Sequence, residues 1–156
     1  MAVSAYDRVT HKGVTMSRIM KRALTWVEAQ PGVPVLQCSQ GAYNPGGVAA
    51  SGSTHSAGGS LDIRTSVMSE QQRKATLKAL KRGGWAAWYR DERDGFSPHL
   101  HCVLFCKDRS SSARWQGDEF DAGRNGLTSQ RADRNPWRNP GGPVRFSFRR
   151  RKPVPR

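Results

Sequence analysis

The amino-acid sequence predicts an α+β fold in which helices flank a small antiparallel sheet. Its 156 residues are enough for one hydrophobic core. Segments with apolar residues at helical spacing alternate with short runs of aromatic and branched residues, which are typical of strands. No apolar run approaches the roughly 18 residues that a membrane span requires, so we expect no transmembrane segment.

The first half is expected to begin with a helix. Apolar residues recur at helical spacing over residues 15–30, which predicts an amphipathic helix that ends at Pro31. A short strand is expected over residues 33–37. Residues 41–59 are rich in Gly and Ser and predict a long loop, and loops of this length in a small domain are usually functional or disordered.

The second half alternates strands and helices. Ser69 and Gln72 form a capping-box pattern at the start of a helix that ends at Gly83. The expected order after the loop is strand, helix, strand, strand and a weakly patterned helix, over residues 60–65, 69–83, 85–89, 99–105 and 112–122.

Charge is distributed unevenly along the chain. The formal net charge is +14, from 26 Lys and Arg against 12 Asp and Glu, which predicts attraction to a polyanion. Residues 107–156 carry 13 of the basic and 5 of the acidic side chains. A segment of this kind at the C-terminus cannot bury enough apolar surface to offset its ordering entropy. We therefore divide the chain into a folded domain, residues 1–127, and a basic Pro/Arg-rich tail, residues 128–156.

Two further features concern targeting and disulfides. The N-terminal residues lack the apolar region of a secretory signal, so we expect no signal peptide. Cys38, Cys102 and Cys106 are an odd number without close pairing, which argues against a disulfide scaffold. No C-x-x-C pair supports a zinc site made of cysteines.

Three of the four histidines fall in two short motifs. His55 lies near the end of the Gly-rich loop, and Asp62 lies on the strand that follows. Gly58 and the glycine after it allow a tight turn, so that His55 and Asp62 converge. His99 and His101 alternate along another strand, so their side chains share one face. Two imidazoles and a carboxylate, with one position left open, make the ligand set of a catalytic zinc site.

The two motifs resemble the signature of a known family. The first matches S-x-H-x-x-G-x-A-x-D with serine in place of alanine, at Ser53, His55, Gly58, Ser60 and Asp62. The stretch from His99 to Val103 resembles the H-I-H-C-x-V strand of the hedgehog signalling domain. Together they resemble the D-Ala-D-Ala carboxypeptidase-like zinc peptidases, which share the hedgehog fold, and are closest in look to actinobacterial and actinophage endolysin domains. The resemblance covers about residues 8–127 and implies a zinc cleft on the sheet.

The resemblance implies a zinc metallopeptidase that hydrolyses peptide bonds in bacterial peptidoglycan stem peptides or cross-links. Its cofactor would be Zn2+, held by His55, Asp62 and His101. His99 would face the substrate and help to stabilise the developing oxyanion. The metal would lower the pKa of a water towards 7, and a carboxylate would take the proton as the water attacks.

That carboxylate is expected in an acidic turn. At the two positions where the family carries it, this chain has Pro98 and Gly95, which cannot accept a proton. We assign the role to Asp94, with Glu92 and Asp91 as alternatives. A solvated turn in which none of them reaches the metal remains a further alternative.

Four residues are candidates for contacts with the substrate. Ser53 would bond near the metal or a substrate carboxylate, or cap the loop. Gln40 and Tyr43 would line the cleft, unless they are plain loop residues. Arg64 would pair with a stem-peptide carboxylate or form a surface salt bridge.

Three classes of function follow. The first is an endolysin-like or virion-associated wall hydrolase, made in the cytoplasm, released through a holin pore or carried in a virion, and concentrated on anionic cell-wall polymer by its basic tail. The second is a catalytically inactive, hedgehog-like zinc-binding or virion structural module, which a missing base would favour. The third is a basic nucleic-acid-binding protein, which charge alone suggests, without a phosphate-clamping motif.

Overall fold

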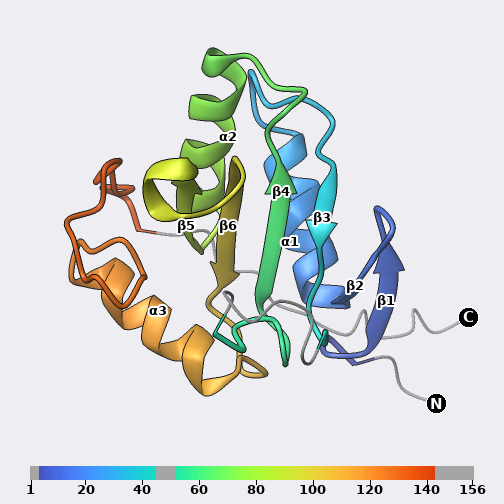
Figure 1. Ribbon diagram of the computed structural model, residues 1–156. Coiled ribbons are helices and arrows are strands. Elements are labelled where there is room, and N and C mark those ends of the chain that lie inside the picture. Colours follow the sequence, from blue (N-terminus) through green and yellow to red (C-terminus); the bar gives the residue numbers. More distant parts are fainter. Residues whose placement is uncertain (1–3, 45–51, 143–156) are drawn as a thin grey trace, which may run out of the picture.

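The computed structural model describes residues 4–44 and 52–142 and confirms an α+β architecture (Figure 1). In this part of the chain, a four-stranded antiparallel sheet has the order β3-β4-β6-β5, and a hairpin of β1 and β2 lies beside it. The elements are β1 (Arg8–His11), β2 (Val14–Ser17), α1 (Arg18–Glu28), β3 (Cys38–Gln40), β4 (Ser60–Arg64), α2 (Glu70–Arg82), β5 (Trp85–Arg90), the short 3-10 helix η2 (Glu92–Asp94), β6 (His99–Leu104) and α3 (Ser111–Asp121).

The two faces of the four-stranded sheet contact different helices. On the first face, Leu100 and Cys102 of β6 belong to the main core, together with buried residues of α1 and α2. On the second face, Trp88 of β5 belongs to a smaller core with Phe120 of α3. His101 lies on this second face, opposite Trp88 in the register. The alternation predicted for β6 is therefore confirmed, and Cys102 is a buried thiol on the far side of the sheet from His101.

The first helix is shorter than the sequence predicts. The apolar pattern extends over residues 15–30, but α1 begins at Arg18, because the preceding residues form β2. Met16 lies on β2 and is fully buried there, so its apolar side chain is compatible with a helix pattern and with a strand pattern. Lys12 and Gly13 have φ of 53° and 77°, the geometry of a tight hairpin turn between β1 and β2.

The strand predicted over residues 33–37 is wrong, and β3 forms just after it. Pro34 has no N–H to donate to a strand ladder, and the N–H of Leu36 donates to the Glu28 carboxylate at 2.7 Å instead. Among the described strands, β3 lies at the edge of the sheet and pairs only with β4.

The other elements confirm the prediction to within about two residues. α2 begins at the predicted capping box, in which Ser69 Oγ accepts from the N–H of Gln72 at 3.1 Å and Gln72 Oε1 accepts from the N–H of Ser69 at 2.9 Å. The structure also contains the strands β4, β5 and β6 and the helix α3. All three cysteines are free and buried.

The chain after residue 127 contacts the rest of the domain as far as it is described, to residue 142. Lys81 Nζ lies 3.1 Å from the carboxylate of Asp133, and each side chain is 2% exposed. The Trp137 ring lies 5.1 Å from Nζ of Lys78. The boundary at residue 127 stays a prediction, and the Arg-rich end of the predicted tail, residues 145–156, lies outside the described residues.

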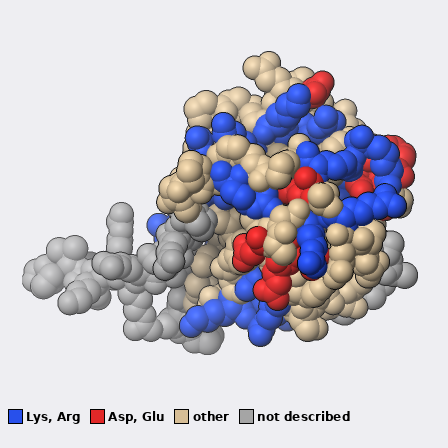
Figure 2. Space-filling model, turned by 90° about the vertical axis from the view of Figure 1, so that its left-hand side faces the viewer, with Lys and Arg blue, Asp and Glu red and all other residues tan. Residues whose placement is uncertain are grey.

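Basic side chains are spread over the side of the molecule that lies at the left of Figure 1, with acidic side chains among them (Figure 2). The basic excess of the composition is thus also visible on the folded surface. None of the helices in the described part of the chain is both long enough and apolar enough to cross a membrane.

Candidate metal centre

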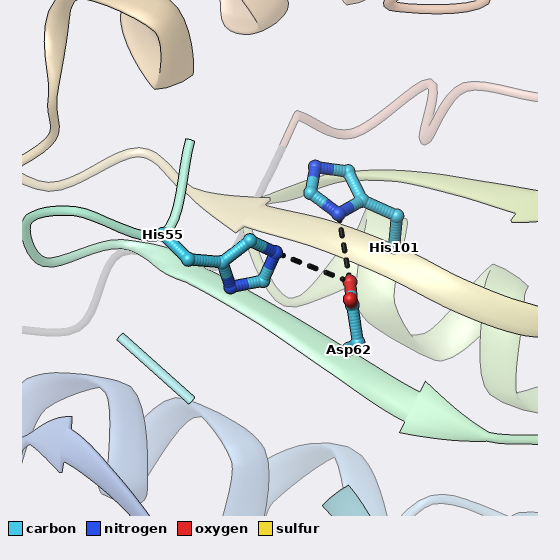
Figure 3. Close-up of side chains that lie close together, drawn as sticks. All are labelled: His55, Asp62 and His101. Atoms are coloured by element: carbon cyan, nitrogen blue, oxygen red, sulfur yellow. Dashed lines mark hydrogen bonds and ion pairs between the residues drawn. The ribbon is translucent and has the colours of Figure 1, made fainter. Parts of the chain in front are cut away.

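Side chains from two strands and a loop meet on the second face of the sheet (Figure 3). Asp62 of β4 lies opposite His101 of β6 in the register, and His55 reaches them from the loop before β4. One ligand atom of each residue lies within 4.8 Å of the others. His55 and His101 are each 1% exposed. The structure therefore joins the two sequence motifs in one cluster, which we call the His-Asp-His group.

The loop that carries His55 depends on close backbone approaches. His55 Nδ1 donates to the carbonyl oxygen of Gly41 at 2.9 Å. A Cβ at Gly41 would lie 2.4 Å from the carbonyl oxygen of Thr15, so glycine is required there. Gly59, with φ of 100°, turns the chain into β4. The bond to Gly41 leaves the lone pair of His55 on Nε2, which points at Asp62 Oδ1 3.4 Å away and has no hydrogen-bond partner in the described residues.

The tautomer of His101 is set by a side chain of α3. Gln116 Nε2 donates to the carbonyl oxygen of Gly126 at 3.0 Å, which turns the amide oxygen of Gln116 towards His101. His101 Nε2 donates to that oxygen at 2.8 Å. The lone pair of His101 therefore lies on Nδ1, which is 2.8 Å from Asp62 Oδ1.

These hydrogen bonds make the His-Asp-His group suitable for a cation. Two imidazole lone pairs point at one carboxylate oxygen, and a metal ion among them would satisfy all three atoms. Burial, and next the charge of Arg90, lowers the pKa of His101 to about 4, so its ring is neutral at pH 7. The buried group can therefore hold a metal ion.

The smaller core fixes the orientation of His101. The Trp88 ring stacks on the His101 ring, with centroids 6.1 Å apart and an interplanar angle of 23°. Trp88 Nε1 donates to the carbonyl oxygen of Arg124 at 2.8 Å, and Phe120 packs edge-on against the indole. The ring of His101 is thus held by its neighbours as well as by its hydrogen bonds.

His99 lies beside the His-Asp-His group without belonging to it. Its Nδ1 donates to the carbonyl oxygen of Ser97 at 2.7 Å, and its Nε2 lies 3.9 Å from Asp62 Oδ1. The side chain is 15% exposed, far more than those of the two other histidines. This imidazole is accessible next to the group, as its predicted role requires.

The acidic turn is engaged by arginines. Arg134 bonds the carboxylates of both Asp94 and Asp91, and Arg93 lies 2.5 Å from Asp91. The bonds from Arg93, and then those from Arg134, hold the pKa of Asp91 well below its usual value, although desolvation opposes them. Glu92 is exposed. Among the described residues, none of these carboxylates joins the His-Asp-His group.

Two of the four candidate substrate residues lie beside the group. Gln40 is opposite Asp62 in the register, and its amide nitrogen is buried without a hydrogen-bond partner in the described residues. Arg64 is opposite His99, with an exposed side chain. Both residues therefore share the face of the sheet that carries the metal ligands.

The other two candidates are engaged elsewhere or exposed. The hydroxyl of Tyr43 donates to the Asp108 carboxylate, and its ring lies 4.1 Å from the guanidinium of Arg8. Burial, and next Asp108, raises the pKa of Tyr43. Ser53 is exposed, with φ of 62°, and its carbonyl oxygen accepts from the N–H of Ser56 at 3.2 Å. Tyr43 thus secures the loop through Asp108.

A pocket of about 610 Å3 adjoins the group on the side of α3. Its wall includes Gln116, which bonds His101, and Thr54, which precedes His55. Arg90 and Asp94 also line it. The sequence reasoning missed Gln116 and Arg90, because a glutamine in a weakly patterned helix and an arginine at a strand end carry no local signal.

Comparison of the chain with protein-family models, with curated proteins and with solved structures finds no match.

Proposed function

We propose that the protein is a zinc-dependent peptidase that cuts peptide bonds of bacterial peptidoglycan, in stem peptides or cross-links. The observation that carries the proposal is the convergence of His55 Nε2, Asp62 Oδ1 and His101 Nδ1 beside an open pocket. Two neutral imidazoles and one carboxylate are ligands that zinc favours in catalytic sites, where one position stays open. The resemblance of the two motifs to the D-Ala-D-Ala carboxypeptidase-like peptidases supports the same reaction.

In this proposal His55, Asp62 and His101 hold the zinc ion, and Gly41 and Gln116 keep the two imidazoles in the ligating tautomers. Bound zinc polarises a peptide carbonyl and lowers the pKa of water towards neutrality.

Neighbouring side chains would assist the reaction. In its imidazolium form, in which both ring nitrogens carry hydrogen, His99 would donate from Nε2, beside Asp62, to the oxygen that gains charge. The buried amide of Gln40 orients the peptide by donating to one of its carbonyl groups. Asp94, on the pocket wall, accepts the proton of the attacking water.

The proposed place of action is the bacterial cell wall. The net charge of +14 and the basic side chains on the folded surface support attraction to an anionic wall polymer (Figure 2). The C-terminal segment would strengthen this attraction in an endolysin-like or virion-associated hydrolase.

A second candidate function is a zinc-binding module without activity. The observation that favours it is the pairing of Asp94 with Arg134, because a carboxylate held by a guanidinium is a weak base. Such a protein would bind zinc and peptidoglycan fragments without cleaving them.

Digestion of purified sacculi tests the proposal and separates the two functions. The peptidase should release fragments whose new peptide termini are identified by mass spectrometry, and the purified chain should contain one zinc by metal analysis. Asp94→Asn should abolish release and keep the zinc, whereas the matched exposed variant Asp118→Asn should change neither. A wild-type chain with zinc but no release would support the inactive module, and a chain that binds no zinc would refute both functions.

A further inference from the structure

Arg90 is a buried cation that has no anionic partner among the described residues. It ends β5, is 3% exposed, and lies within 4.0 Å of no carboxylate in the described residues. Its Nη2 donates to the carbonyl oxygen of Gly126 at 3.3 Å, and its Nε is buried with no hydrogen-bond partner in the same part of the chain. Burying an unpaired charge costs free energy, so this guanidinium is a natural place for an anion to bind.

The two carboxylates that act on Arg90, those of Asp94 and Asp62, are engaged by other side chains. Asp94 is bonded by Arg134, and Asp62 Oδ1 lies 2.8 Å from His101 Nδ1 in the His-Asp-His group. Burial lowers the pKa of Arg90 to about 10, with Asp62 and Asp94 opposing the shift from a distance, so the side chain stays charged at neutral pH. The guanidinium also lies 5.9 Å from the Trp88 ring and 5.3 Å from the Phe96 ring, but neither ring supplies a full negative charge, so an anionic partner would come from outside the described residues.

The position of Arg90 connects this charge to the His-Asp-His group. Arg90 lies opposite His99 in the register. It is two residues along β5 from Trp88, which lies opposite His101, so Arg90 is on the same face of the sheet as these residues. It lines the 610 Å3 pocket together with Gln116, the side chain that bonds His101. An anion held by Arg90 would thus lie in the pocket that adjoins the proposed metal ligands.

The rest of the pocket suits a peptide. Its wall combines aromatic and aliphatic side chains with hydroxyl groups, and its one acidic residue is neutralised by Arg134. Residues of these kinds include Phe96, Trp115, Leu127, Ser111, Ser112 and Thr128. A guanidinium next to such a surface binds a carboxylate through two parallel hydrogen bonds.

We propose that Arg90 binds a free carboxylate of the peptide substrate in this pocket, and so selects peptides that carry a carboxylate close to the cleaved bond. The inference rests on the proposed peptidase function and names its substrate class. It moves carboxylate recognition from Arg64, which is exposed, to a buried arginine that the sequence did not single out.

Binding of short peptides, whose integrity is checked by mass spectrometry after each titration, tests the inference independently of hydrolysis. The probes are acetyl-D-Ala-D-Ala with a free C-terminus, the same peptide as its C-terminal amide, and a C-terminally amidated peptide that carries the free α-carboxylate of a γ-linked D-Glu. Calorimetry on the full chain as purified should give on the order of tenfold to a hundredfold tighter binding for a carboxylate peptide than for the amide. The first and third probes distinguish a terminal carboxylate from an internal one.

Two variants and a spectroscopic measurement complete the test. Arg90→Gln should remove the preference while the zinc content stays unchanged, and the matched exposed variant Arg131→Gln should keep the preference. If Arg90→Gln fails to fold, the side-chain Nε–H resonance of Arg90 in the wild-type protein should shift with the acid and not with the amide. Equal binding of acid and amide, no binding of either, or a preference that survives in folded Arg90→Gln would overturn the inference. A clear acid preference in a chain that cleaves nothing would refute the peptidase and keep the carboxylate site.

Discussion

The two faces of the four-stranded sheet are built by the same strands and obey different physical rules. Leu61 and Asp62 are neighbours on β4, yet Leu61 is fully buried in the main core and Asp62 faces His101. The apolar face requires only side chains of suitable volume, which many sequences provide. The second face must give every buried polar atom a partner.

The second face leaves some of these atoms without partners. Within the described residues, buried nitrogens of His55, Gln40 and Arg90 lack hydrogen-bond partners, and all three residues lie at or beside the His-Asp-His group or its pocket. Such atoms also occur elsewhere, as at Trp85 Nε1 in the main core, but these three gather around one site. The comparison teaches that one face stabilises the fold, while the other holds polar groups that a ligand would satisfy.

The largest effect on the second face is expected when the central carboxylate, Asp62, is removed. Asp62→Ala should lower zinc affinity by more than about 100-fold, because losing a ligand costs more than losing a residue that orients one. The stability of the metal-free protein should change little, since the substitution also removes an oxygen that faces two lone pairs. Metal analysis and urea unfolding with a chelator measure the two quantities. Full zinc content in Asp62→Ala would show that the group is not the metal site.

Substitution of Leu61, the neighbour of Asp62 on the apolar face, should lower stability and leave zinc binding unchanged. Leu61→Ala should lower the free energy of unfolding by about 2–5 kcal/mol, because it leaves a cavity in the main core. The folded fraction should keep its zinc. Urea unfolding checks the first result and metal analysis of the folded protein the second. Val67→Ala, at a position 59% exposed, is the control and should stay within about 0.5 kcal/mol of the wild type.

A smaller effect is expected from the residue that orients His101. Gln116→Leu removes the acceptor for His101 Nε2 and should weaken zinc binding by about 10–100-fold. Competition with a chromophoric chelator measures the affinity. Gln71→Leu, on the exposed side of α2, should leave it unchanged. Equal affinity in Gln116→Leu and the wild type would mean that the ring stacking on Trp88 suffices to orient His101.

The smallest effect expected is on the pH dependence of the free energy of unfolding, through Asp91 in the acidic turn. The pKa of Asp91 is lower in the folded protein than in the unfolded chain, chiefly because of Arg93. The unfolded state therefore binds more protons below the ordinary pKa of an Asp, near 4, and the contribution of Asp91 to stability is lost as the pH falls from there. Asp91→Asn should flatten the acid limb of the curve of unfolding free energy against pH. An unchanged acid limb would contradict the assigned pKa shift.

Part of the fold was predictable because its signals are local. The capping box of Ser69 and Gln72 and the alternation of His99, His101 and Cys102 depend on backbone geometry alone, and the structure confirms them. The start of α1 and the position of β3 were not predictable in this way. Met16 fits a helix and a strand equally, and the course of residues 33–37 depends on a bond from Leu36 to the distant Glu28.

Sequence patterns alone indicated a site made of His55, Asp62 and a histidine of the strand at residues 99–105, and the resemblance of the two motifs assigned His101 rather than His99 as the ligand. The spacing of His55, Asp62 and His101 on a loop and two strands is a property of the chain, and the alternation of side chains along β6 decides which face the histidine occupies. The tertiary structure alone decided the chemistry of these groups. Gly41 and Gln116 set the imidazole tautomers from elsewhere in the chain, and the packing of α3 on the sheet forms the pocket and buries Arg90. Hydrogen-bond partners and burial arise from contacts between distant segments, so no local pattern can encode them.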